Sequence, residues 1–333
     1  MKGRLKLGLD ASFMMSFDDG YSLKYLVGAE KAGFDHLWLG DHFLPWHDSF
    51  EHSFFVWEVL AAVAARTKRI VVGPDVTVPI GGRYHPAMVA QASATMARMF
   101  PGRFVLGVGS GESMNEKRFL GFWPRWEERM DRLVEGVELI KKLWTEADYF
   151  DFHGRYFKMD MVLGPLRPEK PIPVYFSAIG EKSCYAAGEH ADRLLTVGTV
   201  ERCRDVILPR FEAGARSAGR DPRRIEKAVA VNFATGPVKE VIARERRFIA
   251  GASIGANFNQ MDPRLIEKSA AALSDEQILD SVYLFEKGDD VIEVMSRFRR
   301  LGIDQVVVSE LSADPEKAMR IYSKQVIPYF RGG

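Results

Sequence analysis

Short apolar runs rich in Val, Ile and Leu alternate along this chain with longer amphipathic stretches. Runs of this kind are typical of parallel strands that are buried on both faces. Eight such strands are predicted, at Leu5–Leu9, Asp35–Leu39, Ile70–Val72, Phe104–Val108, Val174–Ser177, Arg193–Val197, Ala228–Phe233 and Gln305–Val308.

The amphipathic stretches predict helices between and after these strands. They lie at Gly20–Ala32, Phe54–Arg66, His85–Met99, Glu127–Trp144, Ser183–His190, Val200–Ala218, Val238–Ile249, Asp289–Leu301 and Pro315–Tyr329. Eight strand-helix repeats predict a closed α/β fold, the (β/α)8 TIM barrel. A doubly wound open sheet would have fewer repeats and usually a glycine-rich turn after its first strand, where this chain has Gly8–Ser12.

Two stretches interrupt the repeat and are predicted to be insertions. Residues 149–159 alternate around His153-Gly154 and predict a β-hairpin before the fifth strand. Residues 251–286 are too long for a plain connection and predict a lid over the C-terminal mouth of the barrel. No linker or low-complexity tract divides the chain, so residues 1–333 are predicted to form a single domain.

The charges of the chain nearly cancel, with 46 Lys and Arg against 45 Asp and Glu. This balance argues against nucleic acid or an anionic membrane as a partner and favours a small-molecule substrate. No apolar stretch approaches the roughly 20 residues of a membrane span, and the first residues lack the apolar core of a signal peptide. Cys184 and Cys203 have no metal-type spacing. We therefore expect a cytoplasmic protein with reduced thiols.

Ionisable side chains follow two of the predicted strands. The turn Gly107-Val108-Gly109-Ser110-Gly111-Glu112 places a carboxylate after the fourth strand, and Asp41-His42 follow the second. Enzymes of βα architecture hold their chemistry at these strand ends. The pattern indicates a catalytic mouth with an acid, a histidine and exposed backbone amides. On spacing alone, Glu112 could equally cap the helix that follows it.

Other chemistry-bearing residues have structural explanations. Six potential metal ligands lie in one irregular loop without the i, i+4 spacing of a helical zinc motif, so no metal site is predicted. They are Asp41, His42, His47, Asp48, Glu51 and His52. His36 lies within the predicted strand Asp35–Leu39 and is expected to be a barrel histidine with satisfied hydrogen bonds. Arg83-Tyr84-His85-Pro86 predicts a loop with Pro86 in the first turn of a helix.

Three segments together resemble a known family. They are Asp41-His42-Phe43-Leu44-Pro45-Trp46, Arg83-Tyr84-His85-Pro86-Ala87 and Gly107-Val108-Gly109-Ser110-Gly111-Glu112-Ser113-Met114-Asn115-Glu116. Their order resembles the luciferase-like barrel superfamily, in the branch of dehydrogenases that use the 8-hydroxy-5-deazaflavin coenzyme F(420). That branch includes secondary alcohol dehydrogenases and glucose-6-phosphate dehydrogenases. The resemblance implies hydride transfer from an alcohol carbon to the deazaflavin, which needs two acid-base groups.

The resemblance implies a role for each mouth residue. His42 would lie near the alcohol oxygen and Glu112 near the central ring or the substrate, and the sequence leaves open which of them takes the hydroxyl proton. His42 is favoured, because an unperturbed imidazole titrates near pH ~6.5. Trp46 would be catalytic and would also bind the substrate by walling its pocket. Asp41 would position the ring or the histidine backbone, and Asn115 would bond to the coenzyme or to the Glu112 loop.

The resemblance also implies where the coenzyme binds. Gly73-Pro74-Asp75-Val76-Thr77 matches the place of a non-prolyl cis peptide bond that backs the deazaflavin, and the match puts that bond at Asp75-Val76. Two further segments, Ser110-Gly111 and Ser177-Ala178-Ile179-Gly180, would offer amides and hydroxyls to its ribityl and phosphate parts. One departure is Met14, which stands where family members often carry a glutamate.

The substrate class is predicted from the absence of cationic side chains at three positions. Sugar-phosphate enzymes of this branch hold the phosphate with two lysines and an arginine, and the matching residues here are Thr199, Asn257 and Ser281. Three lost charge-assisted contacts at about 1.5–3 kcal/mol each would weaken phosphate binding, so a neutral alcohol is favoured. Glucose 6-phosphate is the runner-up, because a clamp could be rebuilt from Arg202, Arg204, Arg264 and Lys268. The resemblance also implies a homodimer.

Two further hypotheses stay open. A flavin-dependent monooxygenase of the same superfamily would bind flavin mononucleotide, and Phe43-Leu44-Pro45-Trp46 argues against it. A ligand-binding barrel without catalysis is opposed by the presence of both His42 and Glu112.

Overall fold

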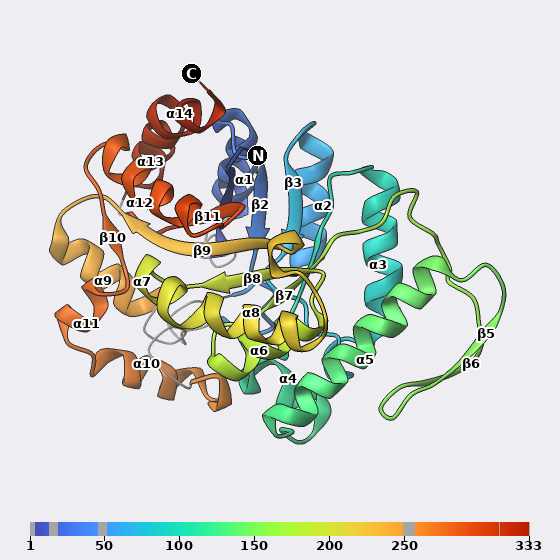
Figure 1. Cartoon of the computed structure of the whole chain (residues 1–333). Helices are drawn as coiled ribbons and strands as arrows, with labels where there is room; N and C mark the ends of the chain where they lie inside the picture. The colour runs from blue at the N-terminus through green and yellow to red at the C-terminus, as the bar shows by residue number, and fades with distance from the viewer. Residues whose placement is uncertain (1–3, 13–18, 46–51, 249–256, 313, 333) are drawn as a thin grey trace.

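Parallel strands surround the centre of the molecule and helices surround the strands (Figure 1). A computed structural model describes residues 4–12, 19–45, 52–248, 257–312 and 314–332. The barrel strands are β1 (Lys6–Asp10), β2 (His36–Leu39), β3 (Val71–Pro74), β4 (Leu106–Val108), β7 (Val174–Ser177), β8 (Arg193–Val197), β9 (Glu226–Ala234) and β11 (Gln305–Glu310). All eight predicted strands are thus present, within a few residues of their predicted bounds.

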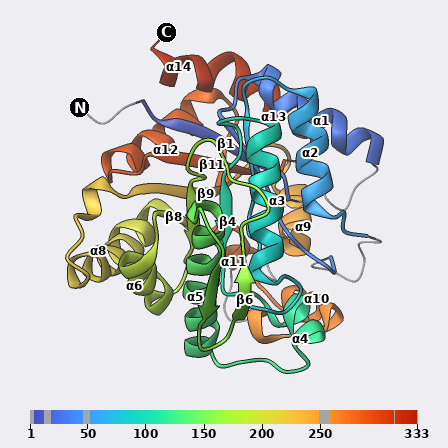
Figure 2. The ribbon, with the colours of Figure 1, turned by 90° about the vertical axis from the view of Figure 1, so that its right-hand side faces the viewer.

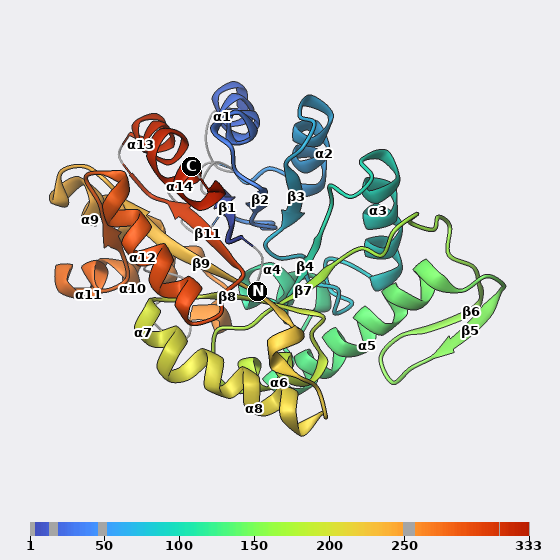
Figure 3. The same ribbon diagram turned by 45° about the horizontal axis from the view of Figure 1, so that its top comes forward.

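The strands are paired in the order β3-β2-β1-β11-β9-β8-β7-β4, and every pair is parallel. The bridges Val72–Phe104 and Thr77–Val108 join β3 to the β4 segment and so bring the two ends of the sheet together. Figure 3 shows the strands inside a ring of helices. The topology confirms the predicted (β/α)8 barrel, in which the C-terminal strand ends share one face.

The helices are α1 (Asp19–Ala32), α2 (Val56–Arg66), α3 (Pro86–Met99), α4 (Ser113–Leu120), α5 (Trp126–Thr145), α6 (Glu181–His190), α7 (Val200–Arg202), α8 (Leu208–Ser217), α9 (Val238–Phe248), α10 (Pro263–Ala271), α11 (Asp275–Leu279), α12 (Gly288–Arg300), α13 (Pro315–Ile321) and α14 (Ile327–Arg331). Local sequence sets several starts. Pro86 is the first residue of α3, as predicted, and the His85 side chain accepts a hydrogen bond from the Ala87 amide.

Two predicted helices contain π-helical turns that the periodicity did not reveal. Val200–Ala218 divides into α7, a π-helical turn at Cys203–Ile207 and α8, and a second π-helical turn at Tyr322–Val326 joins α13 to α14. Each turn lies just before a proline, Pro209 or Pro328. Because proline has no amide hydrogen to donate, the regular pattern of helical hydrogen bonds is interrupted there.

The inner and outer faces of the strands carry different side chains. Alternate residues such as Leu37 and Leu39 pack outward against the helices. The inward residues fill the barrel with a separate apolar cluster that contains Trp38, Tyr175 and Val307. The barrel is therefore a packed core, and open chemistry is confined to its ends.

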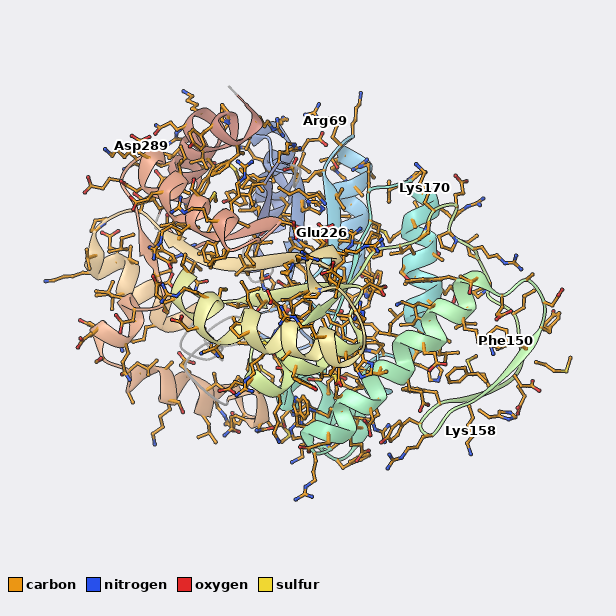
Figure 4. All side chains as sticks on the ribbon, viewed as in Figure 1. Arg69, Phe150, Lys158, Lys170, Glu226 and Asp289 are labelled. Carbon is orange, nitrogen blue, oxygen red and sulfur yellow. The ribbon has the colours of Figure 1, made fainter. Side chains whose placement is uncertain are left out.

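An ionic layer closes the N-terminal end of the barrel. Glu226 accepts from Lys6 Nζ at 2.8 Å and from the Tyr175 hydroxyl at 2.9 Å, and its other oxygen lies 3.0 Å from Arg193 Nη1. Figure 4 shows Glu226 near the centre of the molecule. His36 begins β2 at this end and is buried, but its Nδ1 has no hydrogen-bond partner among the residues that the structure describes. The expectation that His36 is fully satisfied is therefore wrong.

A hairpin follows α5 and is formed by β5 (Phe150–His153) and β6 (Lys158–Val162). It lies in the connection that leads from α5 into β7, and it extends away from the barrel, with Phe150 and Lys158 on its outer part (Figure 4). Its turn packs against the loop after β3, where the rings of Phe157 and His85 are 5.5 Å apart. The hairpin therefore approaches the C-terminal face through its turn.

The stretch between α9 and α12 contains η4 (Asn257–Asn259), α10, α11 and β10 (Tyr283–Leu284), which pairs with β9. The Trp123 indole donates to Asn259 Oδ1 at 2.8 Å, and Arg118 donates to the Met261 carbonyl. Figures 1 and 2 both place α10 near α4. The insertion after β9 therefore reaches the loops after β4, which is the position that a lid requires. Its action as a lid stays a prediction. The assignment of residues 1–333 to a single domain also stays a prediction.

Candidate active site

Asp41 follows β2 at the C-terminal face and is held by three side chains. Thr77 donates to Oδ2 at 2.6 Å, Tyr84 donates to Oδ1 at 3.0 Å, and Arg83 Nη1 lies 2.8 Å from Oδ1. Burial raises the pKa of Asp41, and the Arg83 charge opposes that rise. The carboxylate thus fixes the backbone that leads into His42. Its predicted contact with the coenzyme stays a prediction.

His42, Glu112 and Asn115 lie together, as the sequence predicted for a shared mouth. His42 Nε2 lies 3.6 Å from Glu112 Oε2. Asn115 Nδ2 lies 3.2 Å from both His42 Nδ1 and Glu112 Oε2. Asn115 Oδ1 accepts from the amides of Phe43 and Leu44, which fixes the orientation of its amide group. Asn115 therefore ties the loop after β2 to the start of α4.

Glu112 occupies the N-cap position of α4 but makes no capping hydrogen bond with its side chain. Burial, with a smaller effect from the nearby Glu116, raises the pKa of Glu112 to about 8. A carboxyl group with this pKa keeps its proton at neutral pH and can act as an acid. The geometry therefore favours an acid-base role for the Glu112 side chain over a role as the N-cap of α4.

Burial has the opposite effect on His42 and lowers its pKa to about 4. The imidazole is therefore neutral at pH 7, and one of its nitrogens can act as a proton acceptor. Nδ1 lies 3.2 Å from the Leu44 carbonyl oxygen, which can only accept. When Nδ1 carries the ring proton and donates it to Leu44, the lone pair lies on Nε2. Nε2 is also the nitrogen on the Glu112 side.

Glu116 is a buried carboxyl group to which the sequence analysis assigned no role. It accepts from the Arg83 amide at 3.0 Å, and burial raises its pKa to about 7. Its spacing of four residues from Glu112 on a helix could have indicated that the two lie on one face. Arg83 thus joins Glu116 and Asp41 in one charged network beneath the loop that carries His42.

The loops after β3 and β4 approach each other closely. The Asp75-Val76 peptide bond is cis, at the position that the resemblance implied. A Cβ atom at Gly107 would collide with the carbonyl oxygen of Pro74, so this close approach requires glycine. Gly111 adopts φ +83°, which a larger residue rarely does. Glycines thus bring Ser110-Gly111 against Val76 and its neighbours.

Backbone amides at this face suit a ligand with oxygen acceptors. In the described part of the chain, no acceptor contacts the amides of Ser110, Gly111 or Ile179. Ser177 ends β7, and the Ser183 hydroxyl accepts from the Gly180 amide at 3.1 Å. Ala178 donates its amide to Leu195 of β8, which anchors the loop. This donor set fits the ribityl and phosphate groups of the implied coenzyme.

The substrate-binding residues implied by the resemblance lie partly together. Thr199 caps α7 by accepting from the Arg202 amide, and the Val200 amide donates to the Tyr283 hydroxyl on β10. Ser281 lies two residues before Tyr283, and its carbonyl accepts from Asn232 of β9. Trp46 and Met14 lie outside the described residues, as does the side chain of Asn257.

Three of the four cations that could rebuild a phosphate clamp have other partners. Arg202 donates to the Ile179 carbonyl at 3.1 Å. Arg204 and Arg264 form ion pairs at 2.7 Å with Asp205 and Asp262, their near neighbours in sequence. Of the described residues, no group of three or more His, Cys, Asp or Glu is arranged to hold a metal ion.

A cavity of about 620 Å³ lies at the opposite end of the barrel. It is lined by residues that begin strands, such as Lys6, His36 and Val71, and Arg69 and Lys170 also border it (Figure 4). Its charged residues are largely paired, as in the Arg4–Asp35 and Lys6–Glu226 contacts. Because none of its lining residues belongs to the His42–Glu112 group, we place the candidate active site at the C-terminal face.

A family model described as luciferase-like monooxygenase matches residues 15–305. The chain belongs to this family. The match confirms the resemblance drawn from the three mouth segments.

Individual luciferase-like proteins are similar over nearly the whole chain. The F(420)-dependent glucose-6-phosphate dehydrogenase of Segniliparus rotundus is 34% identical over 332 residues, which cover 98% of each chain. The enzyme of the same name from Mycolicibacterium fortuitum is 34% identical over 333 residues, again covering 98% of each. The solved structure of an F(420)-dependent secondary alcohol dehydrogenase in complex with an F(420)-acetone adduct has a TM-score of 0.92 at 32% identity, covering 99% of this chain and 100% of that one.

Proposed function

We propose that this chain is an F(420)-dependent oxidoreductase that acts on the CH-OH group of a small secondary alcohol or uncharged polyol. The observation that carries the proposal is the pair His42 and Glu112, whose reacting atoms are 3.6 Å apart and whose pKa values burial moves in opposite directions. Two such groups in one site supply a base and an acid at the same pH. Relatives at similar identity use F(420) with alcohol carbons.

His42 acts as the base in this proposal. Two groups compete for Nδ1, since the Leu44 carbonyl oxygen can only accept and Asn115 Nδ2 can only donate, each at 3.2 Å. In the tautomer that donates from Nδ1 to Leu44, the lone pair lies on Nε2, which takes the hydroxyl proton of the alcohol. The loop that carries His42 is fixed from one side by Asp41 and from the other by Asn115. Trp46 lies in the same loop in sequence, and we keep it as a wall of the substrate pocket.

Glu112 acts as the acid. It holds a proton at neutral pH and is positioned by Asn115, which contacts both it and His42. Once Glu112 is ionised, the protonated Nε2 of His42 would return a proton to it across the 3.6 Å gap. The proton lost by the alcohol then replaces the proton lost by Glu112. Both side chains regain their starting states, and the alcohol has lost one hydride and one proton in total.

The coenzyme, when bound, supplies the two-electron acceptor for the hydride. Three segments would hold it. They are Asp75-Val76 with its cis peptide bond, Ser110-Gly111 through their amides, and the loop Ser177-Ala178-Ile179-Gly180. Asp41 and Asn115 would complete the ring end of the site. A homodimer is kept as a proposal from the family resemblance, and a cytoplasmic location as a proposal from the sequence. No helix in the described ranges is long and apolar enough to cross a membrane.

The preferred substrate should be uncharged. Relatives that act on glucose 6-phosphate and on secondary alcohols are about equally identical to this chain, so the local residues decide. Thr199 and Ser281 bring no cation, and Arg204 and Arg264 are paired elsewhere. A dianion in a partly desolvated mouth is disfavoured when few cations are placed to pair with it. The sugar phosphate remains the second candidate, because Arg202 lies near the Ile179 loop.

We therefore expect kcat/KM for isopropanol or a neutral sugar to exceed that for glucose 6-phosphate by at least about tenfold. Steady-state rates with the three substrates at fixed F(420) measure this ratio. Replacing Thr199 and Asn257 by Lys and Ser281 by Arg should shift the preference toward the phosphate ester. A wild-type preference for glucose 6-phosphate would contradict the assignment and would point to Arg202 as part of a clamp.

The pH dependence of kcat/KM should be a broad plateau. The base form of His42 is present above its pKa of about 4, so activity rises with pH in that region. The acid form of Glu112 is present below its pKa of about 8, so activity falls as the pH rises further. Measurements from pH 5 to 10 should show a nearly flat region that ends near pH 8. A maximum near 6.5 with loss of activity on its acid side would contradict the lowered pKa of His42.

Two other functions are less well supported. A flavin-dependent monooxygenase would need to bind flavin mononucleotide. A non-catalytic barrel would not require an acid and a base, whereas His42 and Glu112 have pKa values shifted in opposite directions. Both remain as alternatives that the coenzyme measurement below distinguishes.

A further inference from the structure

We propose that Asp75 is a further acid of this active site, a carboxyl group that keeps its proton and presents it as a hydrogen-bond donor to the deazaflavin ring. This role rests on the proposed function for the identity of the ligand. The protonation of Asp75 itself rests on the geometry of β1, β2 and β3.

Asp75 is separated from Asp10 by a residue that has no side chain. The strand order is β3-β2-β1, so the end of β2 lies between Asp75 and Asp10. The residue there is Gly40, and a Cβ on it would lie 3.1 Å from the Ser12 hydroxyl and 3.8 Å from the Asp75 carbonyl. The register pairs Asp10 with Trp38 and Pro74 with Leu39, so Asp10 and Asp75 both belong to the inward-facing rows that include Trp38 and Gly40. The charge of Asp10 raises the pKa of Asp75.

The hydrogen bonds decide which of the two groups is ionised. Asp10 Oδ1 accepts from the Ser12 amide at 2.9 Å and from its hydroxyl at 2.5 Å, and Oδ2 accepts from the Ser309 hydroxyl at 2.8 Å. Burial raises the pKa of Asp10, and these three donors oppose the rise by stabilising its carboxylate form. No donor among the described residues contacts the Asp75 carboxyl. The shared negative charge therefore belongs on Asp10 and the proton on Asp75.

Burial, and then the charge of Asp10, raises the pKa of Asp75 to about 8. The titratable groups that interact with Asp75 are Asp10 on β1 and Glu112 after β4. With Asp75 and Glu112 both protonated, this cluster carries one negative charge. Above pH 8 the Asp75 proton is lost, and the cluster gains a charge next to the cis peptide bond. The Asp75 carboxyl then changes from a neutral hydrogen-bond donor to a charged acceptor. Binding of a deazaflavin ring that presents an acceptor atom to it should therefore weaken.

The first test measures the proton directly in the protein without coenzyme. Protein labelled with ¹³C at the aspartate carboxyl carbon is titrated by NMR, and the Asp75 signal is assigned by its loss in Asp75→Asn. The matched control is Asp289→Asn, on an exposed helix away from the site (Figure 4). We expect the Asp75 signal to titrate near pH 8 while the Asp10 signal stays that of a carboxylate. An Asp75 signal that is already a carboxylate at pH 6 overturns the proposal.

The second test measures coenzyme affinity in a Glu112→Gln background, which removes the other carboxyl with a pKa near 8. For a group of pKa about 8 that must be protonated, the Kd for oxidised F(420) should rise by about tenfold between pH 7 and 9. The additional substitution Asp75→Asn should reduce this rise to less than about threefold, whereas Asp289→Asn should leave it unchanged. An equal rise with and without Asp75 overturns its role toward the ring. Failure of every variant to bind F(420) overturns the proposed function and this role, while the NMR titration still reports the Asp75 proton.

Discussion

Replacing His42 by Ala should lower kcat for alcohol oxidation by about 10²–10⁴-fold, the usual effect of losing a general base. The substitution removes Nε2, the atom placed to accept the hydroxyl proton. Coenzyme affinity should change little, because the loop remains held by Asp41 and by the Asn115 contact with the Phe43 amide. Steady-state kinetics and a binding titration with F(420) measure the two effects separately.

His153→Ala is a matched control, since this histidine is exposed on the hairpin and pairs with Asp160. It should keep nearly full activity. A His42→Ala enzyme with close to wild-type turnover on the best substrate would show that another group takes the proton.

Replacing Glu112 by Gln should also lower kcat by about 10²–10⁴-fold. Gln keeps the size of the side chain and can still contact Asn115, but it cannot give up a proton. At saturating F(420), kcat of the variant should lose the decline above pH 8, because that limb belongs to Glu112, whereas the titration of Asp75 changes coenzyme affinity. Rates measured from pH 6 to 10 test both statements.

The exposed Glu138 on α5 offers a control of the same chemistry, and Glu138→Gln should leave the rate and its pH profile unchanged. Retention of the limb near pH 8 in Glu112→Gln would assign that pKa to another carboxyl group, with Glu116 the nearest alternative.

The order and type of the barrel elements could be read from the chain because each strand is buried on both faces and each helix on one. These burial patterns are local in sequence. The π-helical turns before Pro209 and Pro328 were missed, because a single such turn inside a long amphipathic helix changes the pattern of apolar positions only locally. Both prolines were visible signals of a break in the helical hydrogen bonds.

The site was predictable to the extent that it depends on strand ends. His42, Glu112 and Asn115 meet because β2 and β4 end on one face. The pKa values were not predictable in the same way. An unperturbed His42 would have titrated near pH ~6.5, whereas burial lowers its pKa to about 4. Burial depends on contacts between distant segments, which no local pattern contains.

The network around Asp41 was missed for the same reason. Thr77 and Arg83 reach Asp41 from the loop after β3, across more than 30 residues of sequence. The unpartnered His36 Nδ1 is another tertiary outcome, since its neighbours in the barrel come from strands that are far apart in the chain. The roles of Trp46 and Asn257 depend on side chains outside the described residues and stay predictions.

The central claim is that this chain binds a deazaflavin at the C-terminal face of its barrel. The most direct test is titration of the purified protein with F(420), flavin mononucleotide and nicotinamide cofactors, with quenching of its six tryptophans as the signal. We predict saturable quenching by oxidised F(420) with a Kd in the micromolar range or tighter, and no flavin mononucleotide retained through purification. A yellow protein with a flavin spectrum that does not respond to F(420) would contradict the account.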